Sequence, residues 1–480
     1  MAIPVPSSAT SPRFDLFLAD IESGFRTWSP LPLQERIEHV RRFRKVMAQN
    51  SEALAHAISR ERCRPLAESL AQEVMPALEM AKYCEKNFRR WLAPQRISCL
   101  RPGFWRKRNT LHFEPWGPVA VITPRNFPFS LGIMSLVYLL LAGNTVLLKT
   151  SEHSRLVTPW IQVLLARAGL SKLGAAAAVS ADGAMGEAVI GHPAVKKVFF
   201  FGSRSSGRRI AEHCIQYFKP FVLELGGGSS AFVCDDAALE TTVSGLVWSS
   251  FYAGGQSCVS TERIFVEKGL AEKFLARFLE KTAMFERELG HSGKVGLYSE
   301  ADVSRYRRCI EAAYDRGGSV LTGGEARPVG NGRFHFDFTV ISETATEMRS
   351  AEEDVFGPLV FCYPTENPEH LLRVAPQDRI GLGASIWTRN PRRAQLMARM
   401  IECGMIWIND ASFGLPHLPW GGWGESGWGS LFSRFSLHEA AQTKWVSAHP
   451  GKWAGKRPWW NPYTPKKARL FLQIARKLYG

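Results

Sequence analysis

One cysteine, Cys258, is the residue in this chain best suited to nucleophilic chemistry. It lies in the stretch Gly255-Gln-Ser-Cys258-Val-Ser-Thr-Glu262, where small residues on both sides let a substrate approach the sulfur closely. A thiol attacks as the thiolate, with an ordinary pKa of about 8.5, so it needs a base or an electropositive setting. Glu224, at the end of the apolar run Phe221-Val-Leu-Glu224-Leu, is a candidate base. Since a lone cysteine is more often a buried apolar residue, the rest of the sequence has to decide.

Asn126, in the segment Thr123-Pro-Arg-Asn126-Phe-Pro128, is a candidate for stabilising an oxyanion. An amide held between two prolines is a preorganised donor for a developing oxyanion. The plainer alternative is an asparagine that only forms a turn.

Two segments are suited to a nucleotide. Phe201-Gly-Ser203-Arg-Ser-Ser-Gly207 ends an apolar strand and opens a helix, where backbone amides and the helix dipole favour phosphate; an ordinary strand-to-helix turn is the alternative. Lys149 and Glu152 follow another strand, where they can contact ribose hydroxyls or be plain surface charges. Gly422-Trp-Gly-Glu-Ser-Gly427 also fits a dinucleotide pattern, but it neither follows a strand nor opens a helix, which predicts a simple glycine-rich loop.

The elements that must position these residues show a change of pattern near Pro94. Before it, helical spacing places Leu33, Ile37, Val40 and Phe43 on one side of a segment. After it, continuous apolar strands alternate with helices, which predicts a parallel sheet covered on both faces. The strands expected in this first sheet are 119–122, 145–148, 175–179, 197–201 and 221–223. A second alternating series, 263–266, 359–361, 384–387 and 405–408, predicts another α/β domain, and 110–114 and 443–448 resemble strands of a separate arm.

Composition narrows the class of protein. The nine cysteines have no paired spacing, which indicates a reducing compartment, and no metal-ligand cluster predicts a metal site. The N-terminus lacks the pattern of a signal peptide. The uncharged stretch between Arg125 and Lys149 is long enough to suggest a membrane span, but Pro128, Gly132 and Gly143 favour a buried helix followed by a buried strand.

The net charge of +16 is concentrated at the C-terminus. After Glu439 the chain has no acidic residue, while Leu470, Phe471, Ile474 and Leu478 line one face of a basic amphipathic helix. The positive residues there are Lys444, Lys452, Lys456, Arg457, Lys466, Lys467, Arg469, Arg476 and Lys477. Such a tail docks on a partner subunit, caps the substrate entrance or lies on a membrane; nucleic acid is not expected, because no recognised binding module is present.

Taken together, residues 14–448 resemble the aldehyde dehydrogenase superfamily. The resemblance rests on motifs in a specific order. These are Pro124-Arg-Asn126-Phe-Pro128, Lys149-Thr-Ser-Glu152, Phe201-Gly-Ser-Arg-Ser-Ser-Gly207, Glu224-Leu-Gly-Gly, Gly255-Gln-Ser-Cys258, Asp354-Val-Phe356-Gly-Pro358, Asn409 and Pro419-Trp-Gly-Gly.

The resemblance implies a role for each motif. Cys258 attacks the aldehyde carbonyl, Asn126 and the Cys258 amide hold the oxyanion, and Glu224 activates the water that releases a carboxylic acid. The cofactor is NAD, with NADP as an option. The residues expected to contact it are Thr123, Pro124, Arg125, Lys149, Glu152, Gly202, Ser203, Gly207, Leu225, Gly226, Asp354 and Phe356.

The sequence departs from the family pattern at several of these positions. Arg125 stands where an aromatic residue is usual, Asp354 replaces a longer glutamate, Gly228 a lysine and Phe201 a threonine. The resemblance also leads us to expect that Arg204, Arg208 and Arg209 crowd the cofactor loop and tolerate a 2′-phosphate.

The expected architecture is α/β and has three parts: a doubly wound cofactor domain, an α/β catalytic domain and a β bridging arm. The predicted boundaries are 1–96 with 116–225 for the cofactor domain, 226–438 for the catalytic domain, 97–115 with 439–449 for the arm, and 450–480 for the basic tail. We expect a cytoplasmic homodimer or homotetramer, peripheral at a membrane if the tail binds one.

The expected reaction is NAD(P)-dependent oxidation of an aldehyde. Trp420, Trp423, Trp428 and Phe251 suggest an apolar or aromatic one. Two alternatives stay open: a CoA-acylating enzyme, which does not need Glu224 as a base, and a non-catalytic scaffold with the same fold.

Overall fold

The computed structural model describes residues 12–98, 107–294, 298–330, 332–342, 355–366, 380–449 and 460–480, with the backbone alone for 12–14 and 290–294. The chain divides into two compact units. The first comprises Met1–Trp91 and Pro115–Ala441, and the second Leu92–Glu114 and Gln442–Gly480. All of the candidate catalytic residues belong to the first unit.

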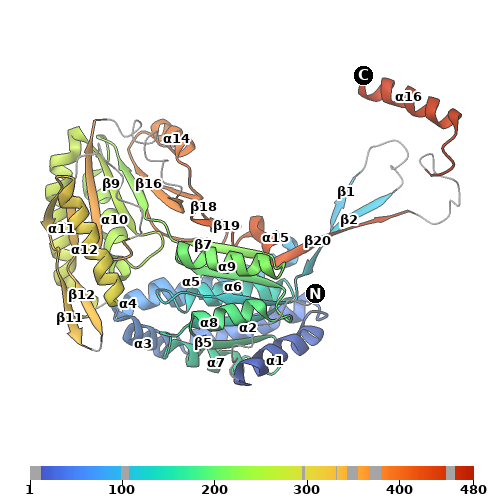
Figure 1. Ribbon diagram of the computed structural model, residues 1–480, viewed down its shortest axis with the longest axis horizontal. Helices are drawn as coiled ribbons and strands as arrows, with labels where there is room; N and C mark the ends of the chain where they lie inside the picture. The colour runs from blue at the N-terminus through green and yellow to red at the C-terminus, as the bar shows by residue number, and fades with distance from the viewer. Residues whose placement is uncertain are drawn as a thin grey trace. The chain divides into compact units, whose positions relative to one another are not determined.

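The first unit begins with a run of helices, as the helical spacing predicted. They are α1 (Pro12–Trp28), α2 (Leu33–Gln49), α3 (Ser51–Arg62), α4 (Leu66–Ser69), a π-helical turn (Leu70–Val74) and α5 (Met75–Trp91). Ile37, Val40 and Phe43 of α2 are buried, which confirms the predicted apolar face. These helices flank the first of two large sheets (Figure 1).

A six-stranded sheet has the order β19-β7-β6-β3-β4-β5. Its five parallel strands confirm the predicted series: β3 (Pro118–Ile122), β4 (Thr145–Ser151), β5 (Ala176–Ala181), β6 (Lys197–Gly202) and β7 (Phe221–Leu225). The sixth strand, β19 (Gly427–Trp428), comes from far along the chain and runs antiparallel to β7. Every residue of β3 and β4 is buried, as expected for strands covered on both faces.

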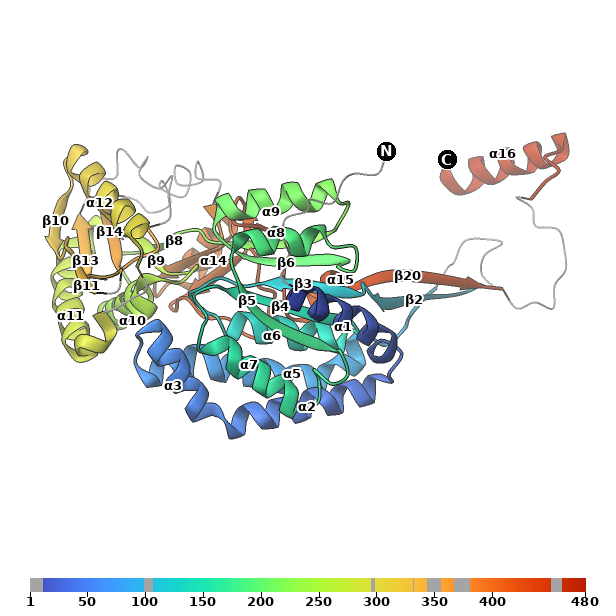
Figure 2. The ribbon, with the colours of Figure 1, turned by 60° about the horizontal axis from the view of Figure 1, so that its bottom comes forward.

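Helices cover both faces of this sheet. The side chains of α1, α8 (Gly183–Gly191) and α9 (Arg204–Gln216) pack with Ala120, Leu147 and Phe200 in one apolar cluster. On the other face lie α6 (Ser130–Leu141) and α7 (Val157–Arg167), where Gly132 of α6 fits closely over Leu148. Figure 2 shows α8 and α9 on one side and α6 and α7 on the other.

A seven-stranded sheet follows, with the order β10-β13-β14-β9-β8-β16-β17. All neighbouring strands are parallel except β10 and β13. The strands are β8 (Ser229–Val233), β9 (Thr261–Glu267), β10 (Ser319–Thr322), β13 (Thr339–Ser342), β14 (Leu359–Thr365), β16 (Gly383–Trp387) and β17 (Met405–Ile408). The predicted second α/β series is therefore confirmed, although β8, β10 and β13 were not predicted.

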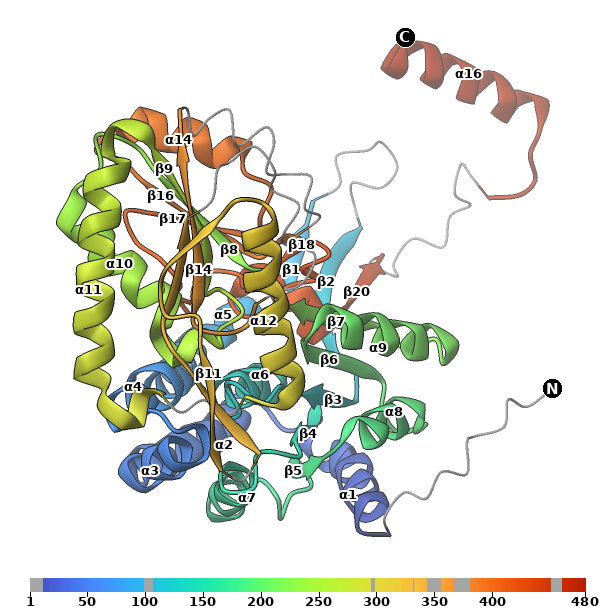
Figure 3. The same ribbon diagram turned by 60° about the vertical axis from the view of Figure 1, so that its left-hand side comes forward.

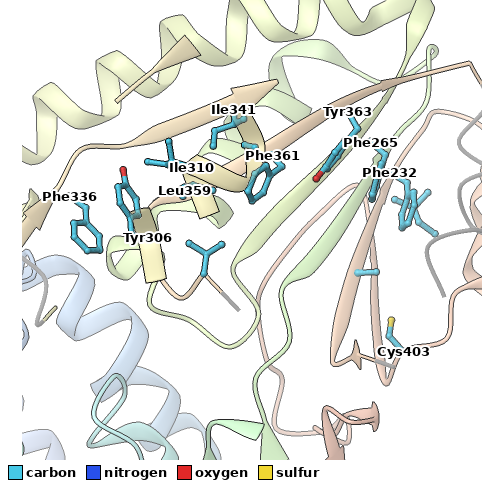
Figure 4. Close-up of a cluster of buried hydrophobic side chains, with 14 of the residues drawn as sticks. Phe232, Phe265, Tyr306, Ile310, Phe336, Ile341, Leu359, Phe361, Tyr363 and Cys403 are labelled. Atoms are coloured by element: carbon cyan, nitrogen blue, oxygen red, sulfur yellow. The ribbon is translucent and has the colours of Figure 1, made fainter. Parts of the chain in front are cut away.

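Helices cover both faces of the seven-stranded sheet (Figure 3). One core contains side chains of α10 (Leu239–Phe251) and α11 (Lys268–Lys294), and the other contains side chains of α12 (Glu300–Asp315) and α14 (Pro391–Met400). In the second core the rings of Phe232, Phe265 and Tyr363 stack in series, with centroid distances of 5.3 and 5.0 Å (Figure 4). Beside this sheet β11 (Ala326–Gly330) and β12 (Arg333–Phe336) form an antiparallel pair.

The glycine-rich stretch after Trp420 forms strands, not a nucleotide-binding turn. β18 (Trp423–Gly424) pairs with β15 (Ile380–Gly381), and β19 pairs with β7. The dismissal of Gly422–Gly427 as a dinucleotide motif is therefore supported by its geometry.

The second unit contains a three-stranded sheet and a helix. The sheet has the order β1-β2-β20, with β1 (Gln95–Ile97), β2 (Arg108–Pro115) and β20 (Ala441–Ala448), which confirms the two predicted strands of an arm. The helix, α16 (Pro465–Tyr479), occupies the tail. Among the described residues, no helix combines the length and apolar character needed to cross a bilayer; residues 130–151 form the expected buried helix and strand, α6 and β4.

Candidate active site

Cys258 lies in the tight loop between α10 and β9, and its side chain is half-buried. Ala253, Gly254 and Gly255 precede it with φ values of 55°, 63° and 71°, a left-handed run that a chain of bulkier residues would resist. A Cβ at Gly255 would clash with the carbonyl of Gly357. The glycines of the motif are thus needed for the loop's course as well as for access to the sulfur.

Hydrogen bonds brace this loop from several directions. Tyr298 Oη donates to Gly254 O at 2.5 Å, and Ser260 Oγ bonds the carbonyls of Ser249 and Ser250 at 3.1 and 3.0 Å. Tyr252 Oη donates to Ser257 Oγ, the side chain next to Cys258. A loop held this firmly presents its thiol in one orientation, as a nucleophile requires.

Asn126 is brought against the cysteine loop. It is buried, and its Nδ2 donates to Gln256 O, two residues before Cys258, at 2.8 Å. An amide nitrogen carries two hydrogens, so this bond leaves one donor and fixes the plane of the amide. Asn126 was predicted from its sequence context, and the structure places it beside the nucleophile's loop.

A cluster of buried charges that the sequence did not single out supports both segments. Arg64 donates to Asn126 O at 2.7 Å, and Glu68 accepts from Ala253 N at 2.9 Å. Glu73 accepts from Phe129 N and Ser130 N at 3.0 and 2.8 Å, at the start of α6, and Arg62 donates to Arg125 O. The spacing of Arg64 and Glu68 is that of an ordinary surface pair, so only the fold reveals the cluster's position.

Glu224 is buried near the end of β7, between Phe201 of β6 and Gly427 of β19. Neither of its carboxylate oxygens has a hydrogen-bond partner among the described residues. Burial raises the pKa of Glu224 well above its usual value, and the charge of Glu439 adds to this effect. Such a group takes up a proton far more readily than an exposed glutamate.

The sheet topology explains how these segments meet. The chain passes from Glu224 into β8 and from Cys258 into β9, and β8 and β9 are parallel neighbours. Ser229 N donates to Ser260 O at 3.1 Å where the two strands begin. Glu224 and Cys258 therefore approach the same edge of the seven-stranded sheet.

The expected ribose contacts follow β3 and β4. Lys149 is buried at the end of β4, and this burial lowers its pKa although Glu152 and Asp182 oppose the change. Glu152 is half-exposed, 3.5 Å from His153 Nε2. Thr123 N bonds Lys149 O at 2.9 Å, and its buried Oγ1 has no partner within the described part of the chain. An orphaned hydroxyl beside a lysine at the carboxyl ends of parallel strands suits a polar ligand.

The expected phosphate site lies at the start of α9. Ser203 caps the helix by accepting from Ser206 N, and a Cβ at Gly207 would clash with Leu225 of β7. Gly226 N bonds Gly202 O at 3.3 Å, which closes the turn beneath the helix. A strand, a tight turn and a capped helix with close packing form a fitting cradle for pyrophosphate.

Two of the three arginines at this helix are engaged by one acid. Arg204 and Arg208 lie 3.5 and 3.0 Å from the carboxylate of Glu425, whereas Arg209 is exposed. A 2′-phosphate recruited by these arginines would compete with Glu425.

Arg125 stands where the family usually has an aromatic residue. Its side chain contacts α12, in the helix layer of the seven-stranded sheet. Its Nη2 donates to Asp302 Oδ2 of α12 at 2.7 Å. Asp302 also forms a capping box with Ser299 and bonds Arg305. The loop after β3 is thereby tied to the helix layer of the seven-stranded sheet.

Four further motif positions are Phe356, Asp354, Gly228 and Asn409. Phe356 has a φ of 48°, and its N bonds Glu262 Oε1 at 3.2 Å, while Asp354 lies outside the described residues. A Cβ at Gly228 would clash with the Glu262 carboxylate, so a lysine could not enter without moving it. Asn409 bonds Thr388 through both ends of its amide, which indicates a structural part for this motif residue.

Two small apolar clusters flank the catalytic loop. Phe127, Tyr252 and Ala253 pack with Leu131 and Trp248, and the ring of Trp248 stacks on Tyr252 at 4.7 Å. Cys258 itself packs with a second cluster, whose members are Val259, Leu382, Met405, Trp407, Phe413 and Trp420.

Of the residues expected to line an apolar pocket, Trp420 packs in the same cluster as Cys258, whereas the expectation was wrong for Phe251. The Phe251 ring stacks on Phe338 at 4.5 Å within the closed core under α10, because that face of the helix packs on the sheet. Trp423 and Trp428 are 57% and 68% exposed on the short strands β18 and β19.

Comparisons of sequence agree with this geometry. A sequence model described as the aldehyde dehydrogenase family matches residues 4–446. The chain is 30% identical to a candidate NADP(+) succinate-semialdehyde dehydrogenase of Mycolicibacterium smegmatis, over 86% of this chain and 80% of that protein. It is 28% identical to a 3-sulfolactaldehyde dehydrogenase of Pseudomonas putida, over 88% and 86%.

Solved structures give the same result. PnpE in complex with nicotinamide adenine dinucleotide superposes with a TM-score of 0.84 at 31% identity, over 92% of this chain and 91% of that one. A crystal structure of an NAD-dependent aldehyde dehydrogenase from Sinorhizobium meliloti also gives 0.84, at 27% identity, over 93% and 88%.

Proposed function

This chain belongs to the aldehyde dehydrogenase family, and we propose that it oxidises an aldehyde to the carboxylic acid with NAD(P), using Cys258 as nucleophile, Asn126 as oxyanion donor and Glu224 as base. The observation that carries the proposal is the bond from Asn126 Nδ2 to Gln256 O. This bond holds a buried amide donor against the loop that carries Cys258.

In the first half of the proposed reaction, the Cys258 thiolate adds to the aldehyde carbon and forms a thiohemiacetal. The second hydrogen of the Asn126 amide and the backbone amide of Cys258 stabilise the oxygen that becomes negative. When bound, NAD(P) supplies the acceptor for the hydride, so that a thioester remains on the sulfur.

The chain's residues fit such a cofactor. The capped start of α9 at Ser203 suits the pyrophosphate, and Lys149, with the unpartnered hydroxyl of Thr123 near it, suits the ribose. Glu152 favours a free 2′-hydroxyl, since a carboxylate repels a phosphate there. We propose NAD as the preferred form and test the option of NADP directly.

In the second half, Glu224 takes a proton from the water that attacks the thioester, and the acid leaves Cys258. A buried carboxylate with a raised pKa, and with no competing hydrogen bond from the residues that the structure describes, is well suited to this transfer. The same residue favours hydrolysis over transfer to CoA, because a thiol nucleophile does not need that base.

The deciding experiment follows NADH absorbance with a panel of aldehydes, first with NAD and then with NADP, and measures free acid without added CoA. We expect acid to form with NAD and the Cys258→Ser variant to be inactive. Product that forms only with CoA would favour the acylating enzyme, and no oxidation of any aldehyde would favour the scaffold. Complete inactivity with NADP would remove the proposed tolerance of a 2′-phosphate.

We propose apolar or aromatic aldehydes as substrates. The support is the packing of Cys258 with Trp420 and Phe413 and the neighbouring cluster of Phe127, Trp248 and Tyr252. Relatives are named for succinate semialdehyde and 3-sulfolactaldehyde, which are anionic. A panel that compares benzaldehyde, hexanal and succinate semialdehyde separates the two classes by kcat/KM.

We propose a cytoplasmic homodimer or homotetramer that contacts a membrane peripherally through its tail. The support for self-association is the exposed sheet β1-β2-β20, on which Trp445 is 74% and Val446 43% exposed. The eight cysteines that the structure describes are all thiols, consistent with a reducing compartment.

A further inference from the structure

The C-terminal helix α16 has a stable start. Thr464 accepts a hydrogen bond from Lys467 N, and Pro465 occupies the first helical position, so the local sequence fixes where the helix begins. None of its side chains is buried. A helix of this length that buries nothing needs a surface to stabilise it.

Its side chains separate into two faces. Leu470, Ile474 and Leu478 follow one another at four-residue spacing and are 44%, 39% and 53% exposed. Four positive charges surround this face: Arg469 and Arg476 lie on the opposite side of the helix, and Lys466 and Lys477 lie at the edge of the apolar face.

Arg476 and Lys477 lie in the last turn, where cations suit the helix dipole, but the charges of the first turn do not stabilise the helix. Lys466 and Lys467 lie in the first turn, where the positive end of the helix dipole disfavours cations, and no acidic residue of α16 compensates them. The whole chain after Glu439 is without acidic residues. The charges therefore point to an anionic partner.

Aromatic residues flank the apolar face. Trp460 and Tyr463 precede the helix and Tyr479 ends it, with exposed fractions of 56%, 70% and 74%. Tryptophan and tyrosine with one apolar and one polar end are typical of the lipid headgroup region.

We propose that α16 binds the surface of a bilayer that contains anionic phospholipids. The helix lies in the headgroup region, with Leu470, Ile474 and Leu478 inserted and the four basic residues against lipid phosphates. The proposal makes the peripheral contact specific in its lipid class, and it does not depend on the chemistry at Cys258.

A second copy of this chain fits the helix less well. Its net charge of +16 repels a cationic helix, whereas an anionic bilayer attracts it. Each basic residue near such a surface strengthens binding about fivefold, so four of them and an inserted apolar face suffice for stable association.

The test is sedimentation of the full-length protein with vesicles of phosphatidylcholine alone or with added phosphatidylserine. We expect binding only to the anionic vesicles, weakening as salt is raised because screening shortens the range of the attraction. Equal binding to neutral vesicles, or to neither kind, would overturn the proposal.

Matched variants locate the effect. Replacing Lys466, Arg469, Arg476 and Lys477 with Gln should lower the affinity for anionic vesicles by well over tenfold. The same substitution at Lys45, Lys82, Lys86 and Lys172, which are exposed residues of the first unit, removes an equal charge and should leave most of the binding.

The apolar face is tested by Ile474→Glu and Leu478→Glu together, with oligomer mass and aldehyde oxidation measured in parallel. Loss of vesicle binding at unchanged mass and activity supports the proposal. A lower mass would show that the face is a subunit contact, which contradicts it. Aldehyde oxidation in solution reports separately on the proposed catalytic function, so the two can fail independently.

Discussion

At the scale of single residues, Glu224 is the group whose chemistry depends most on its surroundings. Its burial leaves the carboxylate without a hydrogen-bond partner in the described structure and raises its pKa. An exposed glutamate at neutral pH is a weak base, and this environment makes the residue a stronger one.

Glu224→Gln should separate the two halves of the reaction. Thioester formation does not require the base, so we expect a burst of NADH followed by turnover slowed roughly 10²–10⁴-fold. Rapid-mixing absorbance measures both phases, and Cys258→Ser serves as the control without a burst. Steady turnover at the original rate would contradict the assigned base.

The same substitution tests the electrostatics through stability. The pKa of Glu224 is higher in the folded protein than in the unfolded chain, where it is about 4.3. As pH rises from the unfolded pKa through the folded pKa, the free energy of unfolding therefore falls, because the folded protein must ionise a buried group. The Gln variant has no such cost. The difference in melting temperature, variant minus parent, should grow between pH 5 and 9 by a few degrees; parallel curves would show that Glu224 ionises freely.

Sequence motifs singled out the candidate catalytic residues but not the side chains that hold them in position. Cys258, Asn126 and Glu224 stand in distinctive contexts, whereas Arg64 and Glu73 resemble surface charges until α3–α5 fold around them. Phe251 was misplaced because an aromatic residue near a glycine-rich loop has the same sequence signature in a pocket and in a core.

At the scale of elements, the helices before β3 act as a frame for the catalytic loops. Glu73 accepts hydrogen bonds from two backbone amides at the start of α6, and Glu68 accepts one from the cysteine loop. Arg64 lies between the two acids, 3.8 Å from the Glu73 carboxylate and 3.7 Å from that of Glu68. These charges compensate one another inside the protein, where an unpaired charge is costly.

Arg64→Met should therefore be severe. It leaves Glu68 and Glu73 without their cation and should cost about 3–5 kcal/mol of stability, together with a fall in kcat from a displaced Asn126. The control is Arg277→Met, whose pair with Glu240 is exposed to solvent and should matter far less to stability. Denaturant unfolding measures both, and equal losses would contradict a framing role for Arg64.

The tie between Arg125 and α12 can be tested through Asp302→Asn. Although burial favours the neutral form, Arg125 and Ser299 hold the pKa of Asp302 below its usual value. Its stabilising contribution is present above the unfolded pKa and lost as pH falls through the folded one. We expect a loss of about 1–2 kcal/mol at pH 7, from the ion pair and the helix cap, that shrinks in acid. A loss independent of pH would exclude the ion pair as its source.

Sequence patterns predicted the long apolar strands to within a few residues, since burial on both faces gives a continuous signal. The strand β8 was missed because Ser229-Ser-Ala-Phe-Val is short and half polar, although it is the central link between the two sheets. The strands β15, β18 and β19 contain two residues each, and only tertiary pairing defines them.

At the scale of the whole molecule, the candidate catalytic residues and the basic helix belong to different units. The first contains both sheets and every candidate catalytic residue, and the second contains a small sheet and a basic helix. The two strands that the sequence could not assign to either domain, β2 and β20, are neighbours in the three-stranded sheet of the second unit.

Trp445→Lys should reduce the mass of the proposed oligomer. A charge at an exposed apolar position of β20 disfavours a buried contact between subunits. The matched control is Trp460→Lys, the same change on a 56% exposed residue outside the sheet, which should leave the mass in solution unchanged. Analytical ultracentrifugation compares the two, and an unaltered mass for Trp445→Lys would place the subunit contact elsewhere.

The pairing of β7 with β19 has a consequence for biosynthesis. The strand that carries Glu224 has an open edge until Gly427 and Trp428 have been translated and folded back onto it. While residues 226–426 are being synthesised, the nascent chain therefore exposes an unpaired strand to other chains, and the candidate nucleophile Cys258 is made well before the candidate base Glu224 is fixed in place. A ribosome that stalls before this point releases a product prone to aggregate, and only a nearly complete polypeptide can become active.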